Sequence, residues 1–593
     1  MRLSFLNRFR SDSGYALPAV IILSAVMLVL VTGSLSVTSS GMVKADDDQD
    51  AGGALAAAYA GVAEYQSRLS NDSTYQKYGN SASLYTSSPA STVSLPTGAA
   101  ANPAFGVLAT DAWAIVPGSD NRASYRYEIN NSQYGTSGVI KLRVTGKVGN
   151  VTRTIVADLR QKGFLDFLYF TDFETLDPDI FGGTDCDRYA WANPARPVAC
   201  QKIQFGAADT INGPLHTNDR LSICGSTFNG DVTSASTLAF SNECTGTAIR
   251  WNGSANAVIK APAYRSAITI PPTNSQLRKE ARNDLSTDVP RPGCLYTGPT
   301  EITLNSDGTM TVSSPWTKYT NISLTPGISS ANPAQCGTLS ALRSAAGATI
   351  PVLEKNLIYV QNVPNDTSDV NYSAGLPTNF VCSGSGRDQS WSFRGTTFPM
   401  AGESRPATSS TTAPAYGCKN GDAFVKGTLA GELTIGSENY VYVTGDVKYA
   451  NAESSILGLI GQNAVWVYNP MAFTYNSSGT ITGSTAVLPA AGGRTIQAAV
   501  LSVAHTIMVQ NYQYGGQRGT LTVLGALAQK FRGTVATTSG GSIVNGYAKS
   551  YTYDERLRFT APPKFLTPVS TTYGVTQYAS VNSAFTPQGA KIP

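Results

Sequence analysis

Charged residues and histidines are scarce in this chain of 593 residues. Asp, Glu, Lys and Arg make up 14% of the chain, whereas soluble domains usually contain about a quarter. The formal net charge is only +4 and there is no strongly basic field, which argues against a nucleic-acid partner. The sequence also lacks the GxxxxGK[ST] motif that holds nucleotide phosphates, so it does not predict a motor that hydrolyses ATP.

The two histidines do not occur in a recognisable catalytic pattern. His216 lies in the segment 215–220, near Asp219 in sequence, and we interpret this segment as a polar turn. His505 lies in the alternating run 503–509 and is expected to be packed or hydrogen-bonded. A hydrolase triad needs a nucleophile beside its base, and no GxSxG turn is present. We therefore expect a protein that is not an enzyme and needs no cofactor.

Acidic residues gather after the aromatic segment 164–170, as Asp172, Glu174, Asp177, Asp179, Asp185 and Asp187. Enzymes that cleave polysaccharides use paired carboxylates, and calcium prefers carboxylate ligands. The spacing does not match an EF-hand loop, and Asp177-Pro178-Asp179 is typical of a turn. We expect no bound metal, with the first four acids of the group as the candidate ligands should calcium bind.

The cysteines are even in number and all lie in the middle of the chain: Cys186, Cys200, Cys224, Cys244, Cys294, Cys336, Cys382 and Cys418. An even number predicts disulfides in an oxidising compartment, although eight cysteines allow 105 pairings. Sequential pairing is our preferred hypothesis because each bond would close a local loop. Zinc sites use closely spaced pairs such as CxxC, which this chain lacks.

The N-terminal region combines a short basic segment with a long uncharged run. Arg2, Arg8 and Arg10 precede Gly14, and these charges favour a cytoplasmic location for the first residues. A secretory signal carries its small cleavage residue after the apolar stretch, whereas Gly14 lies before it. The apolar run from Ala16 is long enough to span a bilayer. Apolar residues at helical spacing then continue to about residue 69, so we expect one helix over 15–69.

The sequence Ser13-Gly14-Tyr15-Ala16-Leu17-Pro18, with the apolar run behind it, resembles the class III leader of type IV pilins and pseudopilins. The resemblance implies that a prepilin peptidase cuts between Gly14 and Tyr15, and that methylation accompanies this processing. It also implies that residues 1–14 are the leader. The following helix would serve as a membrane anchor and as an assembly stalk among other pilin subunits.

One position departs from the usual pilin pattern. Ala19 is the fifth residue after the cut, where most pilins have a glutamate that pairs with a neighbour's terminal amine. The chain therefore resembles minor pilins of the pilus tip complex, of the PilX type, better than major subunits. Residues 56–65 resemble the same group, and residues 546–565 resemble the closing segment of large pilus-assembly proteins.

The pattern of short apolar runs predicts a mainly β fold after the helix. Residues 70–162 are expected to form a linker and a small antiparallel meander, like the head of a pilin. Residues 163–593 contain many short strands with glycine corners, which favour a right-handed β-helix with disulfide-pinned insertions at about 186–418. Several β-sandwiches are the alternative. The Tyr- and Pro-rich tail, about 546–593, is expected to cap the open end.

Two functions remain open from the sequence. In the first, the chain is a non-enzymatic minor pilin that displays a large β-rich body for tip assembly or adhesion, with a host-surface or glycan ligand. In the second, it is a membrane-anchored surface β-helix protein that binds or acts on polysaccharide. The expected location is a single-pass membrane protein before assembly and an extracellular pilus or cell surface afterwards.

Overall fold

The computed structural model describes residues 16–83, 85, 91–98, 101–106, 112–134, 139–161, 163–181, 200, 202–244, 248–251, 262–406, 414–489, 492–539, 542–558, 560–568 and 573–592. The chain divides into two compact units. Unit 1 contains Met1–Gln133, Val139–Arg160 and Tyr573–Pro593, and unit 2 contains Tyr134–Gly138 and Gln161–Thr572. The expected leader, with Gly14 and Tyr15, lies outside the described residues.

Unit 1 is built on helix α1 (Ala16–Asn71), whose two ends differ in character. Large apolar residues from Val20 to Val31 are between 51% and 68% exposed. Further along, Ala54, Val62 and Leu69 belong to a buried stripe at helical spacing. Within the described residues, no helix combines the length and the hydropathy needed to cross a membrane.

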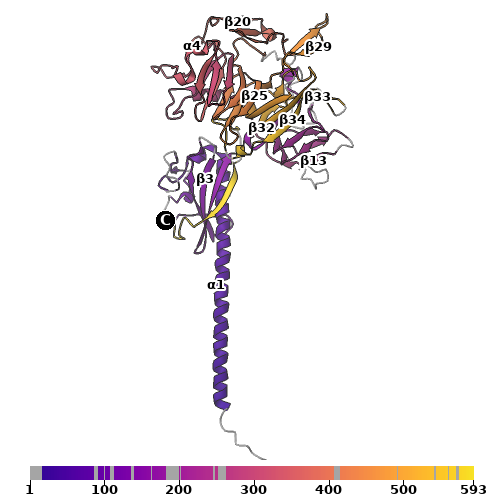
Figure 1. The fold of residues 1–593 in the computed structure, drawn as a ribbon. Coiled ribbons are helices and arrows are strands. Elements are labelled where there is room, and N and C mark those ends of the chain that lie inside the picture. The colour runs from indigo at the N-terminus through magenta and orange to yellow at the C-terminus, as the bar shows by residue number, and fades with distance from the viewer. Residues whose placement is uncertain are drawn as a thin grey trace, which may run out of the picture. The chain divides into compact units, whose positions relative to one another are not determined.

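The buried stripe of α1 lies against an antiparallel sheet (Figure 1). In sheet order its strands are β1 (Ala114–Ile115), β2 (Ala123–Asn130), β3 (Val139–Val148), β4 (Val151–Gln161) and β35 (Tyr573–Val581). The helix approaches β3 closely because Gly146 has no side chain: a Cβ there would lie 2.0 Å from the carbonyl oxygen of Ala54. Tyr65 of the helix packs edge-on against Tyr127 of β2, with ring centroids 5.2 Å apart. The predicted meander is therefore present, with the tail of the chain as an added strand.

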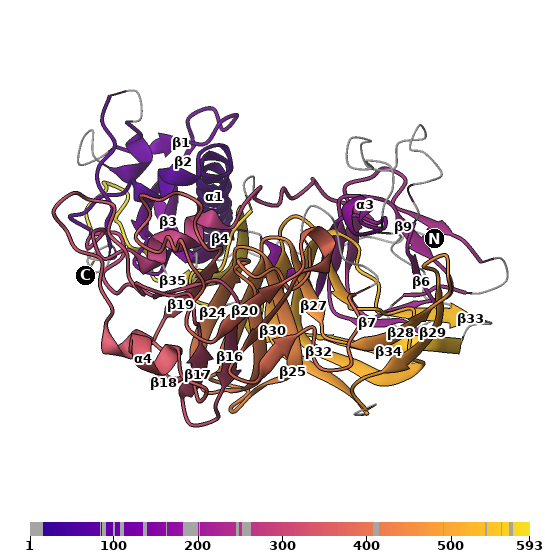
Figure 2. The same cartoon turned by 90° about the horizontal axis from the view of Figure 1, so that it is seen from above.

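Unit 2 is dominated by a large sheet in which strands pair in parallel with strands of the next turn of the chain (Figure 2). One row of the stack runs β15 (Cys294–Thr297), β19 (Asn356–Gln361), β24 (Glu432–Ser437), β26 (Ile456–Gly461), β30 (Gly493–Ser502), β32 (Gln517–Phe531), β5 (Tyr169–Phe173), β8 (Leu215–Thr217), β11 (Val232–Ser234) and β14 (Ala263–Tyr264).

A second row of parallel strands shares β30 and β32 with the first row. It runs β16 (Thr300–Leu304), β23 (Ala423–Leu429), β25 (Tyr440–Tyr449), β30, β32, β34 (Ser542–Tyr553), β7 (Thr210–Asn212), β10 (Thr227–Phe228) and β13 (Arg250–Trp251). A third row contains β25, β27 (Ala464–Val467) and β31 (Ile507–Val509). A separate parallel sheet joins β6 (Gln204–Phe205), β9 (Leu221–Ile223) and β12 (Phe240–Asn242).

The order of strands in the stack differs from their order in the chain. We name residues 169–264 the early segment and residues 294–553 the late segment. The early segment continues the stack beyond the late one, because β5 pairs with β32 and β7 pairs with β34. We call these contacts the joint. Apolar residues in register run through it, as Val500, Leu527, Tyr169 and Leu215, and their burial favours stacking.

Antiparallel hairpins and short helices decorate the stack. The strands are β17 (Thr309–Ser313), β18 (Ala348–Pro351), β20 (Phe380–Ser383), β21 (Ser390–Phe393), β22 (Thr396–Phe398), β28 (Met471–Tyr475), β29 (Ile481–Ala486) and β33 (Ala536–Ser539). Within the described residues of unit 2, the helical turns are α3 (Pro178–Phe181), α4 (Leu339–Leu342), η4 (Phe164–Asp166), η5 (Ser275–Ala281), η6 (Ala334–Cys336), η7 (Gly386–Asp388) and η8 (Glu555–Arg558). Unit 1 contains η1 (Ser73–Lys77) and η3 (Pro103–Phe105).

The C-terminal region differs from its expected role as a cap over 546–593. Residues up to Tyr553 complete β34 inside the stack, where β7 of the early segment pairs with it. The last strand, β35, is the neighbour of β4 in the sheet of unit 1. The end of the tail therefore belongs to unit 1, where the edge of β4 offers it a hydrogen-bonding partner. The position in the stack that the tail was expected to cover is occupied by the early segment.

Disulfides join Cys224 to Cys244, Cys294 to Cys336, and Cys382 to Cys418, as sequential pairing predicts for these cysteines. Cys200 is also disulfide-bonded, and its predicted partner Cys186 lies outside the described residues.

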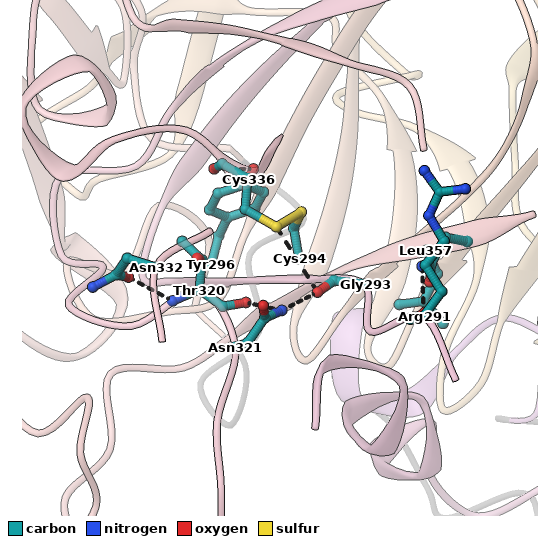
Figure 3. Close-up of a disulfide and its surroundings, with 10 residues drawn as sticks. Arg291, Gly293, Cys294, Tyr296, Thr320, Asn321, Asn332, Cys336 and Leu357 are labelled. Atoms are coloured by element: carbon teal, nitrogen blue, oxygen red, sulfur yellow. Dashed lines mark hydrogen bonds between the residues drawn. A yellow bond between two sulfur atoms is a disulfide. The ribbon is translucent and has the colours of Figure 1, made fainter. Parts of the chain in front are cut away.

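Figure 3 shows the bond between Cys294, the first residue of β15, and Cys336 of η6. Tyr296 donates a hydrogen bond from its hydroxyl to the carbonyl of Cys336 at 2.9 Å, and the Asn321 amide donates to the carbonyl of Gly293. This bond therefore fixes a long excursion of the chain to the first strand of the stack.

Candidate functional site

Polar side chains gather at one corner of the stack, beside the joint. Three polar residues occupy equivalent positions at this corner: Asn439, Asn463 and His505. Each lies two residues before a strand residue, and those strand residues, Val441, Val465 and Ile507, are in register with one another. The side chain of Asn463 donates a hydrogen bond to that of Asn439. Stacked turns thus place polar groups one above another, and His505 is the member of this ladder that lies nearest the early segment in the stack.

His505 contacts the early segment directly through Asp177. The His505 Nδ1 atom lies 2.8 Å from Asp177 Oδ2, although the two residues are 328 positions apart. Asp177 is fully buried and His505 is 7% exposed. The other oxygen of Asp177 accepts a hydrogen bond from the backbone N–H of Asp179 at 2.9 Å, which holds the start of α3 in place. The turn predicted at Asp177-Pro178-Asp179 is in the structure the beginning of this helical turn.

Asp179 completes a group that could hold a metal ion. Single ligand atoms of Asp177, Asp179 and His505 all lie within 4.8 Å of one another. Asp179 is exposed, so an ion held here would keep access to water. Two carboxylates and an imidazole are suitable ligands for a divalent cation.

A third carboxylate, Asp422, lies at the same corner of the stack. It is fully buried, and its Oδ1 atom accepts hydrogen bonds from the Tyr440 backbone at 3.2 Å and the Asn439 side chain at 2.5 Å. Among the described residues, its Oδ2 atom has no hydrogen-bond partner. Burial raises the pKa of Asp422 to about 8. Burial also raises the pKa of Tyr440 well above its ordinary value, and Asp422, Asp177 and Asp179 add to that shift.

Two ion pairs also cross the joint. Glu174 accepts a hydrogen bond from Arg532 at 2.9 Å, and both side chains are 1% exposed. The guanidinium carbon of Arg532 also lies 3.5 Å from the centre of the Phe205 ring, a cation–π contact. Asp209 pairs with Lys549 at 2.7 Å. Burial lowers the pKa of Lys549, and Asp209 opposes that effect. The two halves of the stack are thus joined by buried charges as well as by apolar residues.

An interior cavity of about 20 Å³ lies between these ion pairs and the apolar ladder. Tyr169, Arg532 and Lys549 belong to its lining. Such a volume accommodates about one water molecule, which would have polar partners here.

The four acids proposed as calcium candidates separate into different environments. Asp172 accepts a hydrogen bond from Asn218 at 2.9 Å, and Glu174 pairs with Arg532. Only Asp177 and Asp179 share a site, and they share it with His505. The sequence offered no signal that would bring a residue of the late segment to this pair, beyond the expectation that His505 is hydrogen-bonded.

The interpretation of His216 as part of a polar turn is wrong. It lies in β8 and is fully buried, with its ring stacked on Phe167 and Phe170 at centroid distances of 5.2 and 5.9 Å. Its ring nitrogens contact the Thr233 hydroxyl at 2.9 Å and the Asn218 side chain at 3.2 Å. Burial lowers the pKa of His216 to about 4, and the charge of Arg265 adds to this shift. The short strand was missed because its polar sequence lacks an apolar alternation.

No protein-family model matches the chain, and no curated protein matches its sequence. Among solved structures, the chain is similar to the competence-associated pilin ComZ from Thermus thermophilus. The similarity covers 90% of this chain and 97% of that one, with a TM-score of 0.24 and 10% sequence identity.

Proposed function

We propose that this chain is a non-enzymatic, minor pilin-like component of a type IV pilus or a related system. The observation that carries the proposal is the contrast along α1. One end of the helix packs on the sheet of unit 1, while the large apolar residues from Val20 to Val31 are more than half exposed. Burying such side chains is worth roughly 1.5–3 kcal/mol each, so this end of the helix needs an apolar environment from outside the chain.

A bundle of similar helices provides that environment after assembly, and a lipid membrane provides it before assembly. Other pilin subunits would then be the partners of α1. The leader sequence around Gly14 supports this order of events, because its resemblance to prepilins implies cleavage that keeps the apolar helix in the mature protein. We interpret the parallel stack of unit 2 as a right-handed β-helix that the fibre displays outside the cell, for tip assembly or for binding a host-surface or glycan ligand.

Ala19 favours a place at the fibre tip. In a shaft, each subunit would bury a terminal amine without the usual acidic partner, and an unpaired buried charge costs several kcal/mol. One or a few copies at the end of the fibre avoid most of this cost.

The decisive experiment compares Gly14→Glu with the matched helix control Gly33→Ala, for which a Cβ meets nothing within 4 Å. The control should yield a mature chain that begins at Tyr15, by intact mass, and that co-purifies with sheared fibres. Gly14→Glu should remain at full length and be absent from the fibres. Antibody against unit 2 should label the fibre ends. Unchanged processing of Gly14→Glu would contradict the prepilin assignment, and uniform labelling along the shaft would contradict the tip position.

A further inference from the structure

We propose that Asp177, Asp179 and His505 form a binding site for a divalent transition-metal ion of the zinc class, which clamps the early segment of unit 2 to the late segment. The proposal does not depend on the pilus assignment, since it rests on unit 2 alone. Its starting point is geometric: the three side chains offer ligand atoms that all lie within 4.8 Å of one another.

The site combines residues from two segments that lie far apart in the sequence. Asp177 and Asp179 precede and begin α3 in the early segment, and His505 precedes β31 in the late segment. The Asp177 carboxylate is fixed by the Asp179 backbone and is fully buried, so its position is set before any ion binds. His505 is also buried, with an exposed fraction of only 7%. Two of the three ligands are thus preorganised by the fold.

A further buried carboxylate lies farther along the same corner of the stack. Asp422 is fully buried at the same corner, and its Oδ2 atom has no hydrogen-bond partner within the part of the chain that the structure describes. Asp422 contacts Asn439, which lies two strands away from His505 in the ladder of β25, β27 and β31, so Asp422 is not a ligand of this site. The proposed site therefore rests on Asp177, Asp179 and His505 alone.

The donor set selects the kind of ion. Calcium is bound by six to eight oxygen atoms and magnesium by an octahedron of oxygens, so an imidazole nitrogen disfavours both. Zinc accepts histidine nitrogen together with carboxylate oxygen. Three protein ligands leave a fourth position of the tetrahedron for water, which the exposed Asp179 allows. The structure therefore favours a site for zinc, formed by two carboxylates and an imidazole, over a calcium site formed by four acidic residues.

The location of the site gives the ion a structural role. The ion pairs Glu174–Arg532 and Asp209–Lys549 cross the same joint, and a metal bridge from Asp177 to His505 would add a further link at the corner. An ion that binds only the folded joint stabilises the folded protein in proportion to the logarithm of its concentration.

The test uses the full chain in detergent, stripped with a chelator and then titrated separately with ZnCl₂, MnCl₂ and CaCl₂. Bound metal is counted by plasma mass spectrometry, and unfolding is followed by intrinsic fluorescence. We expect one equivalent of Zn²⁺ and a rise in Tm of at least about 2 °C at saturating metal.

Asp179→Asn is the informative variant because Asp179 is exposed, so its loss should leave the Tm of the metal-free protein unchanged while weakening Zn²⁺ binding at least about tenfold. Asp231→Asn, an exposed acid elsewhere in the early segment, is the matched control and should bind Zn²⁺ like the wild type. His505→Gln should abolish binding.

Equal Zn²⁺ affinity in Asp179→Asn and the wild type would overturn the proposal, as would an unchanged Tm on metal addition. Binding of Ca²⁺ alone would overturn the assignment of the metal. If His505→Gln fails to fold, the Asp179→Asn comparison decides the question.

Discussion

The two units of this protein bring distant parts of the chain together by different physical means. In unit 1, α1 lies on the sheet through apolar and aromatic side chains and through the missing side chain of Gly146. In unit 2, the joint between the early and late segments combines an apolar ladder with the buried pairs Glu174–Arg532 and Asp209–Lys549. The first interface depends mainly on shape and the second depends on charge as well.

This difference predicts different responses to substitution and to pH. An apolar interface is sensitive to changes of volume, because close packing leaves no room for added atoms, and its stability depends little on pH because apolar side chains do not titrate. A buried ion pair tolerates neither the loss of one partner nor a change in its protonation, because an unpaired charge remains in an apolar surrounding. Substitutions at Gly146 and Arg532 test the two interfaces separately, and acid titration of His216 tests the interior of the early segment.

The largest effect is expected for Gly146→Val. A Cβ at this position would lie 2.0 Å from the Ala54 oxygen and 2.3 Å from the Ala58 nitrogen, and backbone atoms of a helix cannot move aside cheaply. We expect α1 to leave the sheet, with a loss of more than about 4 kcal/mol in the stability of unit 1. Hydrogen exchange of β2, β3 and β4 measures this loss.

Gly52→Ala is the control for that variant, because a Cβ there meets nothing within 4 Å and alanine favours the helix by roughly 0.5–1 kcal/mol. Protection of β3 that is unchanged in Gly146→Val would show that the close approach does not hold the helix on the sheet.

The next effect is expected for Arg532→Met, which leaves Glu174 buried without its partner. We expect a loss of about 3–5 kcal/mol in the stability of unit 2, measured by chemical denaturation. Burial already raises the pKa of Glu174, and Arg532 opposes that effect. The variant should therefore take up a proton on folding, and its stability should fall as pH rises through the raised pKa of Glu174.

The double variant Glu174→Leu with Arg532→Met should recover most of the lost stability, since it removes both charges together. Arg558→Met is the surface control, because the Arg558–Glu555 pair is mostly exposed and such pairs contribute less than about 1 kcal/mol. A double variant as unstable as Arg532→Met would mean that packing, not charge, explains the loss.

The smallest effect is expected from acid acting on His216. Its pKa is lowered to about 4 in the folded protein from an ordinary value of 6.5, so the unfolded chain binds more protons between these pH values. The stabilisation is present above pH 6.5 and is lost as pH falls towards 4, by about 3 kcal/mol in total. His216→Gln should flatten this part of the pH profile. An equal slope in wild type and variant would assign the acid sensitivity to another group.

Several local features of the fold could be predicted because neighbouring residues determine them. Helical spacing predicted a helix over 15–69, and α1 spans Ala16–Asn71. Alternation around Tyr127 and Leu142 predicted strands, and both residues are fully or almost fully buried in β2 and β3. Sequential pairing predicted the bond between Cys294 and Cys336. Each prediction depended on a side-chain period or on the pairing of successive cysteines.

Other features could not be predicted because they depend on pairing between strands far apart in the chain. The sequence of the short strand β5 does not indicate whether the strand lies at the end of a stack or in its middle. In the structure it pairs with β32 of the late segment. For the same reason, the sequence could not show that the fold separates two of the four candidate calcium ligands, Asp172 and Glu174, from the pair that meets His505.

The sequence by itself determined the extent of the long helix, the alternating strands and the cysteine loops, because these depend on side-chain periodicity and on pairing between successive cysteines. Only the tertiary structure decided that the tail returns to the sheet of unit 1 and that the early segment extends the stack. It also decided that Asp177 meets His505. Strand edges offer the same backbone hydrogen bonds to any partner, so the choice among distant partners rests on the packing and charge complementarity of the folded chain.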